Sequence, residues 1–250
     1  MALKNLATYF LNLVQQERKS PNFWMSEEYI RLAKLKWVEE DHLQGFKNDE
    51  GYWFFTPYNT TTKEFEPIGL VGFQDEYLLG SQTFWDHEFI YDPKNFVSLS
   101  GNKWKVFRRH IRKLDNPYWS YERLPDDEEM DKHVAALFLD WAEGRELFDP
   151  EIFTKFVIQG ENRFGLFLNG VLMGVNIADT NFKYINYRIC VDTGEEFLNE
   201  YLRWRFYTSE WVQDQNKLVN DGGCLGSEGL KRFKMKLRPI EIKNIYVFNI

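Results

Sequence analysis

Cysteine and histidine are scarce in this chain of 250 residues, which contains two cysteines and four histidines. Cys190 and Cys224 do not form a C-x-x-C pair, and the histidines at 42, 87, 110 and 133 are scattered, so no metal-binding spacing is present. His87 is therefore interpreted as a packed or surface histidine rather than a ligand. We expect no metal, reduced thiols and a cytoplasmic protein.

Long apolar runs and an excess of positive charge are also missing. No segment approaches the ~18 consecutive apolar residues of a membrane-spanning helix. Residues 1–20 are amphipathic and unlike a signal peptide, so we expect no membrane span. The formal net charge is -7. An acidic chain is not expected to coat nucleic acid, so any such contact must use a local basic patch.

The motifs of several enzyme classes are absent. The sequence has no G-x-x-x-x-G-K-[S/T] phosphate loop, no strand followed by G-x-G-x-x-G, no G-x-S-x-G and no H-E-x-x-H. These absences argue against a P-loop enzyme, a dinucleotide-dependent enzyme, a serine hydrolase of the α/β type and a zinc protease. We expect no cofactor.

The composition is that of a globular protein, with 44% hydrophobic and 18% aromatic residues. The length allows one large domain or two small ones. Asp115-Asn116-Pro117 is interpreted as a break between a unit at 1–117 and a unit at 118–250. The periodicity predicts helices at 3–18, 26–40, 103–114, 126–143, 150–159, 193–211 and 227–237. It predicts strands at 51–58, 65–73, 85–91, 183–191, 216–220 and 242–248, and a hairpin at 163–177 around Asn169-Gly170.

The stretch from Asn220 to Pro239 is the centre of the functional prediction. Glycines at 222, 223, 226 and 229 follow a short strand and precede a cationic helix that begins near Ser227. A strand, a glycine turn and a helix N-terminus together present backbone N–H groups to an anion or a developing oxyanion. The alternative is a glycine-rich connection to an ordinary amphipathic helix, and the residues alone favour that alternative.

Two motifs resemble a known family. The run Gly226-x-x-Gly229-Leu230-x-x-Phe233-Lys234, preceded by Asn220-Asp221-Gly222-Gly223, resembles the closing motif of the phosphatidylglycerol lysyltransferase C-terminal-like family. A related pattern occurs in the peptidoglycan-bridge aminoacyltransferases. The segments Tyr91-Asp92-Pro93, Leu99 to Trp104 and Arg108 to Ile111 are similar to the middle motif of the same family.

The resemblance implies a mixed α/β fold of two GNAT-like units in tandem, the first of them degenerate. The order of elements predicted in the second half is also that of a GNAT domain: helix, helix, hairpin, strand, helix, strand, helix, strand. The membrane-embedded half of lysyltransferases that act on lipid is not expected here.

The resemblance also implies roles for particular residues. Lys234 matches the motif lysine that stabilises charge on the donor or intermediate, and Asp221 is placed to orient an attacking amine or accept its proton. Donor binding is assigned to Gly226, Gly229, Lys231 and Arg232. The alternative interpretations are a surface lysine on a cationic helix and an ordinary turn aspartate.

The donor is inferred from the segment Val191-Asp192-Thr193-Gly194-Glu195-Glu196. Enzymes of the GNAT class that use acyl-CoA cradle its pyrophosphate at this position. Three carboxylates at a helix N-terminus stabilise the helix but repel a pyrophosphate. The difference fits the tRNA-dependent relatives, in which an aminoacyl ester replaces the thioester.

A basic helix face could contact the phosphates of such a tRNA donor. Lys105, Arg108, Arg109 and Arg112 cluster beside the apolar face of the helix at 103–114, and we interpret them as a contact for nucleic-acid phosphates. The alternative is a solvated surface.

The leading hypothesis is an acyltransferase that moves an aminoacyl or acyl group from aminoacyl-tRNA, or else acyl-CoA, to an amine or hydroxyl of a small molecule, peptide or nucleic acid. Replacing Lys234 with alanine is expected to abolish transfer and leave folding intact. One alternative is a GNAT-fold enzyme that modifies a nucleic-acid base. Another is a non-catalytic binding module with the same fold.

Overall fold

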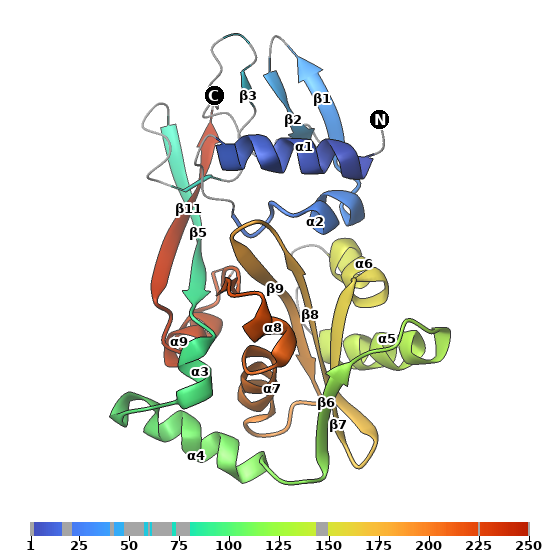
Figure 1. Ribbon diagram of the computed structural model, residues 1–250, viewed down its shortest axis with the longest axis vertical. Helices are drawn as coiled ribbons and strands as arrows, with labels where there is room; N and C mark the ends of the chain where they lie inside the picture. The colour runs from blue at the N-terminus through green and yellow to red at the C-terminus, as the bar shows by residue number, and fades with distance from the viewer. Residues whose placement is uncertain are drawn as a thin grey trace.

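A mixed sheet of eight strands dominates the computed structural model, which describes residues 3–16, 22–40, 43–47, 58–59, 61, 72–73, 81–143, 150–224 and 226–249. Its strand order is β4-β11-β5-β10-β9-β8-β7-β6 (Figure 1). A smaller sheet has the order β1-β2-β3. The strands predicted at 51–58 and 65–73 lie largely outside the described residues.

The elements have the following bounds. The large sheet contains β4 (Gly72–Phe73), β5 (Ser81–Tyr91), β6 (Trp119–Arg123), β7 (Asn162–Leu168), β8 (Val171–Thr180), β9 (Tyr184–Asp192), β10 (Leu218–Asn220) and β11 (Glu241–Asn249). The small sheet contains β1 (Lys36–Glu40), β2 (Leu43–Lys47) and β3 (Tyr58–Asn59). The helices are α1 (Leu3–Gln16), α2 (Glu27–Leu32), α3 (Lys94–Ser98), the 3-10 turn η2 (Asn102–Trp104), α4 (Lys105–Leu114), α5 (Glu128–Ala142), α6 (Pro150–Gln159), α7 (Leu198–Tyr207), α8 (Glu210–Asp214) and α9 (Glu228–Lys236).

The sheet joins strands from both sides of the predicted break at residue 117. β5 lies between β10 and β11 and pairs antiparallel with both. In Figure 1, β5 and β11 form a long ribbon beside the rest of the sheet. The division into units at 1–117 and 118–250 stays a prediction.

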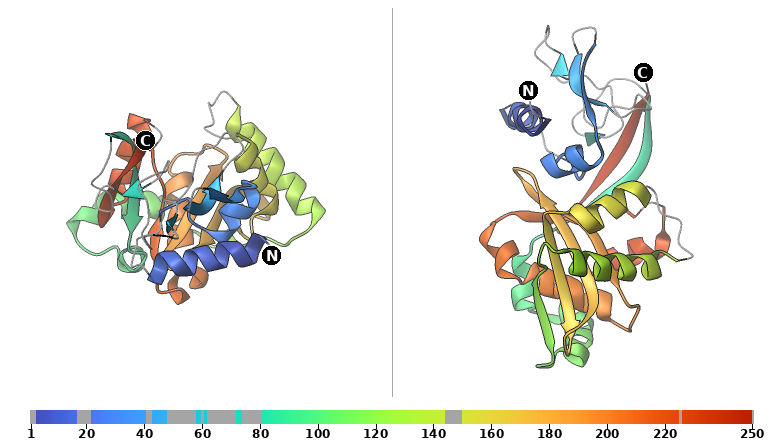
Figure 2. Two further views of the ribbon diagram at one scale, coloured as in Figure 1. Left: turned by 90° about the horizontal axis from the view of Figure 1, so that it is seen from above. Right: turned by 90° about the vertical axis from the view of Figure 1, so that its right-hand side faces the viewer.

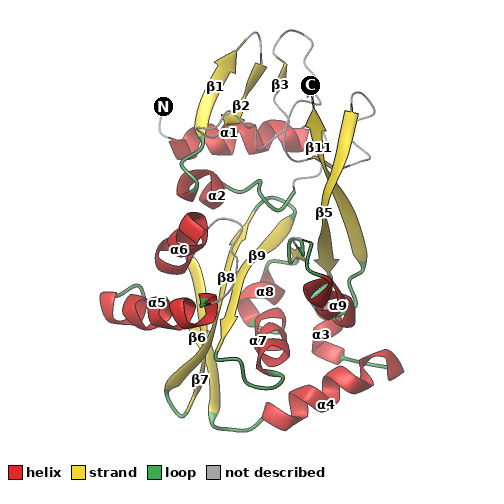
Figure 3. Ribbon diagram, turned by 180° about the vertical axis from the view of Figure 1, so that it is seen from behind, coloured by secondary structure: helices red, strands yellow, loops and turns green. Residues whose placement is uncertain are grey.

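Helices cover both faces of the sheet and enclose two apolar cores. α5 and α6 lie on one face of β8 and β9, and α7 lies on the other (Figure 3). The first core also takes buried residues from α1 and α2, and the second takes them from α3 and α4. The right-hand view of Figure 2 shows α5 and α6 in front of the strands and α1 and α2 above them. The candidate site lies between these two helical layers.

Local signals placed several elements correctly. The hairpin of β7 and β8 turns at Asn169 and Gly170, whose φ angles of 50° and 81° are the left-handed values that a type I′ turn requires. α4 and α9 occupy the predicted ranges to within a few residues. Ser227 caps α9, and its hydroxyl accepts a hydrogen bond from the Leu230 N–H at 3.3 Å.

Other elements differ from the predictions. The helix predicted at 26–40 ends at Leu32, because Lys34 adopts a left-handed φ of 53° and the next residues pair with β2 as β1. The helix predicted at 193–211 is α7 followed by α8, since Ser209 starts a new helix by capping the Val212 N–H. Asp127 caps α5 by accepting the Met130 N–H, one residue after the predicted start of the helix at 126. β6 was not predicted at all.

Candidate active site

The site begins where two parallel strands separate. β9 and β10 are the parallel pair of the large sheet, and their register ends with Asn220 beside Asn186. β9 continues to Asp192, whereas β10 stops and the chain turns along β5 instead. The Asp221 N–H donates to the Phe89 carbonyl at 3.0 Å, and the Phe89 N–H donates to the Gly222 carbonyl at 3.2 Å. The backbone beyond residue 186 of β9 therefore faces a gap instead of a strand.

Glycine is required in the turn at two positions. Gly222 has a φ of 60°, and a Cβ there would lie 3.0 Å from the Phe23 ring. A Cβ on Gly223 would lie 2.0 Å from Asp86 Oδ2. That carboxylate oxygen accepts the Cys224 N–H at 2.8 Å. β5 therefore holds the turn through the Asp86 side chain as well as through its backbone. The turn is a packed structure and not a loose connection.

Lys234 and Asp221, the two predicted catalytic residues, are brought together beneath this turn. Lys234 is 4% exposed, and its Nζ lies 3.2 Å from Asp221 Oδ1. Nζ also donates to the carbonyl oxygens of Asp221, Gly222 and Gly223, the last at 2.7 Å. Since an ammonium has only donors, this set of oxygens requires the protonated amine. Lys234 is therefore a buried residue that stabilises the turn, and not a surface residue.

The Asp221 carboxylate has two further partners that the sequence did not indicate. Arg203 Nε lies 3.1 Å from Oδ2, and the Tyr207 hydroxyl donates to the same oxygen at 3.2 Å. Burial acts to raise the pKa of Asp221, but Arg203 and then Lys234 outweigh it and hold the pKa below its ordinary value. Burial raises the pKa of Tyr207, so its hydroxyl stays a donor. Asp221 is thus held as an ionised, fully engaged carboxylate.

A cavity of about 730 Å³ occupies the gap between the separated strands. One side of it is formed by the turn and α9, through Gly222, Gly223, Ser227, Leu230 and Phe233. Further lining residues come from β9, β5, β11 and α7, from the segment at 23–24, and from α5 and α6. A substrate group could therefore reach the N-terminus of α9 and the turn together.

Of the predicted donor-binding residues, some lie at the cavity and others do not. Gly229 lines the cavity, and Gly226 stands exposed just before α9 with a φ of 75°. Lys231 and Arg232 are not among the described residues that line the cavity, and Arg232 Nε donates to the Glu228 carbonyl at 3.3 Å. Their role in donor binding stays a prediction.

The acidic loop after β9 also borders the cavity. Asp192 accepts the Gly194 N–H at 2.8 Å and the Asn199 side-chain amide at 2.7 Å. α7 begins only at Leu198, after Phe197 in a left-handed conformation, and Glu195 and Glu196 are exposed. The helix predicted to start at 193 therefore starts five residues later, at Leu198. Asp192, Glu195 and Glu196 precede α7 along the chain, and the Asp192 carboxylate accepts a hydrogen bond from its second residue, Asn199.

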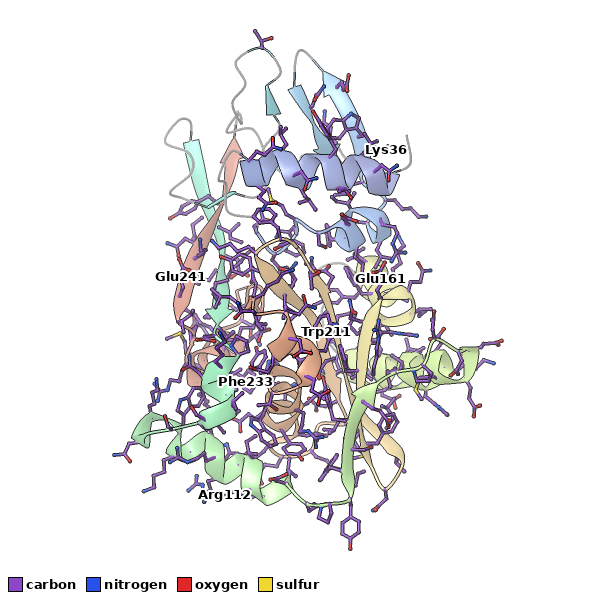
Figure 4. The ribbon with its side chains drawn as sticks, viewed as in Figure 1. Lys36, Arg112, Glu161, Trp211, Phe233 and Glu241 are labelled. Atoms are coloured by element: carbon purple, nitrogen blue, oxygen red, sulfur yellow. The ribbon has the colours of Figure 1, made fainter. Side chains whose placement is uncertain are left out.

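The basic face of α4 lies away from the cavity. Lys105, Arg109 and Arg112 are exposed, and Figure 4 shows Arg112 at the outer edge of the molecule. Arg108 is half-buried and donates to the carbonyl oxygens of Leu99 and Gly101. Arg108 therefore supports the turn before α4, which leaves the other three as the solvent-facing cations of the predicted surface.

The sequence matches no family model and no curated protein, whereas solved structures share its fold. A conserved protein of unknown function from Bacteroides thetaiotaomicron aligns with a TM-score of 0.67 at 16% identity, over 91% of this chain and 90% of its own. The C-terminal domain of a proposed lysylphosphatidylglycerol synthetase from Agrobacterium fabrum aligns at 0.61 and 13%, over 97% and 92%. L-PGS from Bacillus licheniformis aligns at 0.58 and 14%, over 86% and 80%.

These likenesses show the fold. They confirm the predicted mixed α/β fold, and they include the type of C-terminal domain whose motifs the sequence resembles. Within the described residues, no helix is both long enough and apolar enough to span a membrane.

Proposed function

We propose that this protein is an acyltransferase that moves an aminoacyl group from aminoacyl-tRNA to an amine or hydroxyl acceptor inside the cavity. The observation that carries the proposal is the cavity itself. It opens where β9 and β10 separate, and it is bordered by the glycine turn, the N-terminus of α9 and the buried Lys234. Two proteins that share the fold support the choice of an aminoacyl group. One is named as a domain of a lysylphosphatidylglycerol synthetase, and the other is named L-PGS.

The chemistry follows from charge. When an acceptor attacks an acyl carbonyl, negative charge develops on the carbonyl oxygen. The N-terminal N–H groups of α9 and the cationic Lys234 beneath the turn provide a positive potential at the wall of the cavity. Because Nζ is occupied by protein oxygens, we assign Lys234 to holding the turn and supplying this field, and Asp221 to fixing the ammonium in place.

The donor is assigned to tRNA and not to CoA because of the loop after β9. Asp192, Glu195 and Glu196 precede α7 along the chain, and Asp192 occupies the Gly194 N–H that a pyrophosphate would use. Lys105, Arg109 and Arg112 offer an exposed basic surface for the phosphates of the tRNA.

A binding titration tests the proposal. Purified protein is titrated with charged tRNA, uncharged tRNA and acetyl-CoA at two salt concentrations. We expect charged tRNA to bind most tightly, with affinity that falls steeply as salt rises, and acetyl-CoA not to bind. Acetyl-CoA binding without tRNA binding would overturn the choice of donor. Binding of none of the three would overturn the transferase proposal.

A further inference from the structure

A second cavity, of about 240 Å³, lies outside the candidate active site. Its described lining residues come from α1, α2, the start of β7, the end of β8 and the turn before β9. Figure 1 shows α1 and α2 above the turn that joins β8 and β9. The two cavities share none of their described lining residues. Pockets for drug-sized ligands have volumes of about 300–1,000 Å³, so the second cavity suits a smaller molecule.

The second cavity is lined by more acidic than basic side chains. Its described lining contains four carboxyl groups and one guanidinium, those of Glu27, Glu28, Glu161, Asp179 and Arg31. Arg31 Nη2 lies 3.8 Å from Glu161 Oε1, and the two side chains are 45% and 60% exposed. An ion pair this exposed is screened by water, so it does not neutralise the buried part of the cavity.

Asp179 is neutralised from within the protein. Arg188 Nε lies 2.8 Å from Asp179 Oδ2, and both side chains are almost fully buried. The Ser26 hydroxyl donates to Oδ2 at 2.6 Å, and the Asn186 side-chain amide donates to Oδ1 at 2.7 Å. Asp179 is therefore already paired, and the buried acidic group that lacks a cation is Glu28.

Glu28 is a buried carboxyl group with one oxygen unpaired. The residue is 6% exposed, and its Oε1 accepts the Glu161 N–H at 2.7 Å. Of the residues that the structure describes, none donates a hydrogen bond to Oε2. Glu161 and Asp179, the two residues that act most strongly on this carboxyl group, line the same cavity. The Glu28 carboxyl group therefore lies at the cavity wall between them.

The surroundings of Glu28 favour its protonated form until a cation is bound. Burial, and then Asp179, raise the pKa of Glu28 to about 8, while the Glu161 N–H and Arg188 act in the opposite direction. Buried charges in proteins are normally paired with an opposite charge. A cation beside Oε2 would supply that charge and allow the carboxylate to form.

The arrangement favours an organic ammonium over a metal ion. Within the described part of the chain, no group of three or more histidine, cysteine, aspartate or glutamate side chains could hold a metal. Mg²⁺ and Ca²⁺ take about six or more oxygen ligands, whereas an ammonium needs acceptors only for its N–H groups. Leu11 and Phe182 also line the cavity, and they provide apolar surface for an aliphatic stem.

We propose that the second cavity binds a small aliphatic amine in its ammonium form, with Glu28 as the buried contact and Glu27 and Glu161 as contacts nearer to solvent. The ammonium donates to Oε2, and Glu28 releases its proton to solvent as the amine binds. No covalent bond forms. The site is separate from the acyl-transfer cavity, so its existence does not depend on the proposed function.

Isothermal titration calorimetry with diaminobutane tests this site. Titrations at pH 7 in phosphate and in HEPES, which differ in heat of ionisation, measure the protons released. We expect diaminobutane to bind with release of about one proton per molecule, because Glu28 must ionise. Affinity should rise by up to about tenfold per pH unit from pH 6 to pH 8 and then level off. Butanediol, the uncharged analogue of the same length, should bind at least about tenfold more weakly.

Glu28→Gln separates the buried contact from the exposed ones. The variant keeps an oxygen for the Glu161 N–H, and it should lose both the proton release and at least about tenfold in affinity. Glu129→Gln is the matched control, because Glu129 is exposed on α5, and it should bind as the wild type does. Diaminobutane held only by exposed acidic residues would bind Glu28→Gln as tightly as wild type. That result, equal binding of butanediol, or no binding of diaminobutane would overturn the proposal.

A measurement on the wild-type protein provides a check that needs no variant. NMR spectra of protein labelled with ¹³C at the glutamate carboxyl groups follow the titration of Glu28. We expect its midpoint near pH 8 without ligand, and well below that value with saturating diaminobutane, because the bound cation stabilises the carboxylate. A midpoint that diaminobutane leaves unchanged would overturn the role of Glu28.

Discussion

Replacing Lys234 with methionine removes the ammonium beneath the glycine turn while it keeps most of the side-chain volume. The carbonyl oxygens of Asp221 and Gly223 then lose a donor, at a cost of about 1–3 kcal/mol each. The Gly222 carbonyl keeps the Phe89 N–H at 3.2 Å. The structure therefore predicts a loss of stability, in contrast to the expectation from sequence that folding would be unaffected.

The magnitude depends on what remains around the carboxylate. Asp221 keeps Arg203 at 3.1 Å and Tyr207 at 3.2 Å, so its charge is not left alone. We expect a total loss of about 3–4 kcal/mol, at the lower end of the range for breaking a buried ion pair. A domain with about 5–15 kcal/mol of stability would remain folded at low temperature.

Urea unfolding measures this loss. The midpoint should fall in Lys234→Met while the slope with denaturant stays constant. Lys236→Met is the control, because Lys236 is exposed on the same helix, and it should lie within about 0.5 kcal/mol of wild type. A double-mutant cycle with Asp221→Asn should show a coupling energy of at least about 1 kcal/mol. If Lys234→Met is as stable as Lys236→Met, the ammonium does not hold the turn.

Three further perturbations test other parts of the structure. Burial, and then Asp179, raise the pKa of Glu28 to about 8, so this group contributes stability that is complete below pH 4.5 and is lost as the pH rises to about 8. Relative to wild type, Glu28→Gln should therefore gain about 1.4 kcal/mol per pH unit across that window, measured by urea unfolding at pH 5, 7 and 9, and an equal difference at all three would contradict the burial argument. Gly223→Ala should destabilise the protein by about 1–3 kcal/mol because its Cβ meets Asp86, whereas Gly229→Ala, whose Cβ has space, should be neutral, and equal melting temperatures would refute the packing of the turn. Reversing the charge of both Arg109 and Arg112 should weaken tRNA binding and lower its salt dependence, and an unchanged salt slope would exclude this face.

Elements with strong local signals were predictable from sequence. Asn169-Gly170 specifies its turn because those residues tolerate positive φ, and Ser227 specifies the start of α9 because its hydroxyl caps the first turn. β1 and β6 were missed for the opposite reason. Each is a short segment without a strong signal of its own, and each becomes a strand because a neighbouring strand supplies its hydrogen bonds.

The residues of the candidate site also divide into those that local sequence indicated and those that depend on tertiary contacts. Lys234 and Asp221 could be selected because they belong to a motif, and the structure places them 3.2 Å apart. Arg203 and Tyr207 carry no local signal for the site. They reach it because α7 packs on one face of the sheet and β5 is inserted between β10 and β11.

The sequence by itself determined the properties that depend on neighbouring residues along the chain: the glycine turn, the helix that follows it, the acidic loop at 192–196 and the basic face of α4. Only the tertiary structure decided that Lys234 is buried beneath the turn, that Arg108 supports a turn, and that Arg203 and Tyr207 bind the Asp221 carboxylate. The physical reason is that burial and hydrogen-bond partners come from strands and helices distant in sequence. Those contacts set the charge and the proton of each group, which the residue type alone does not.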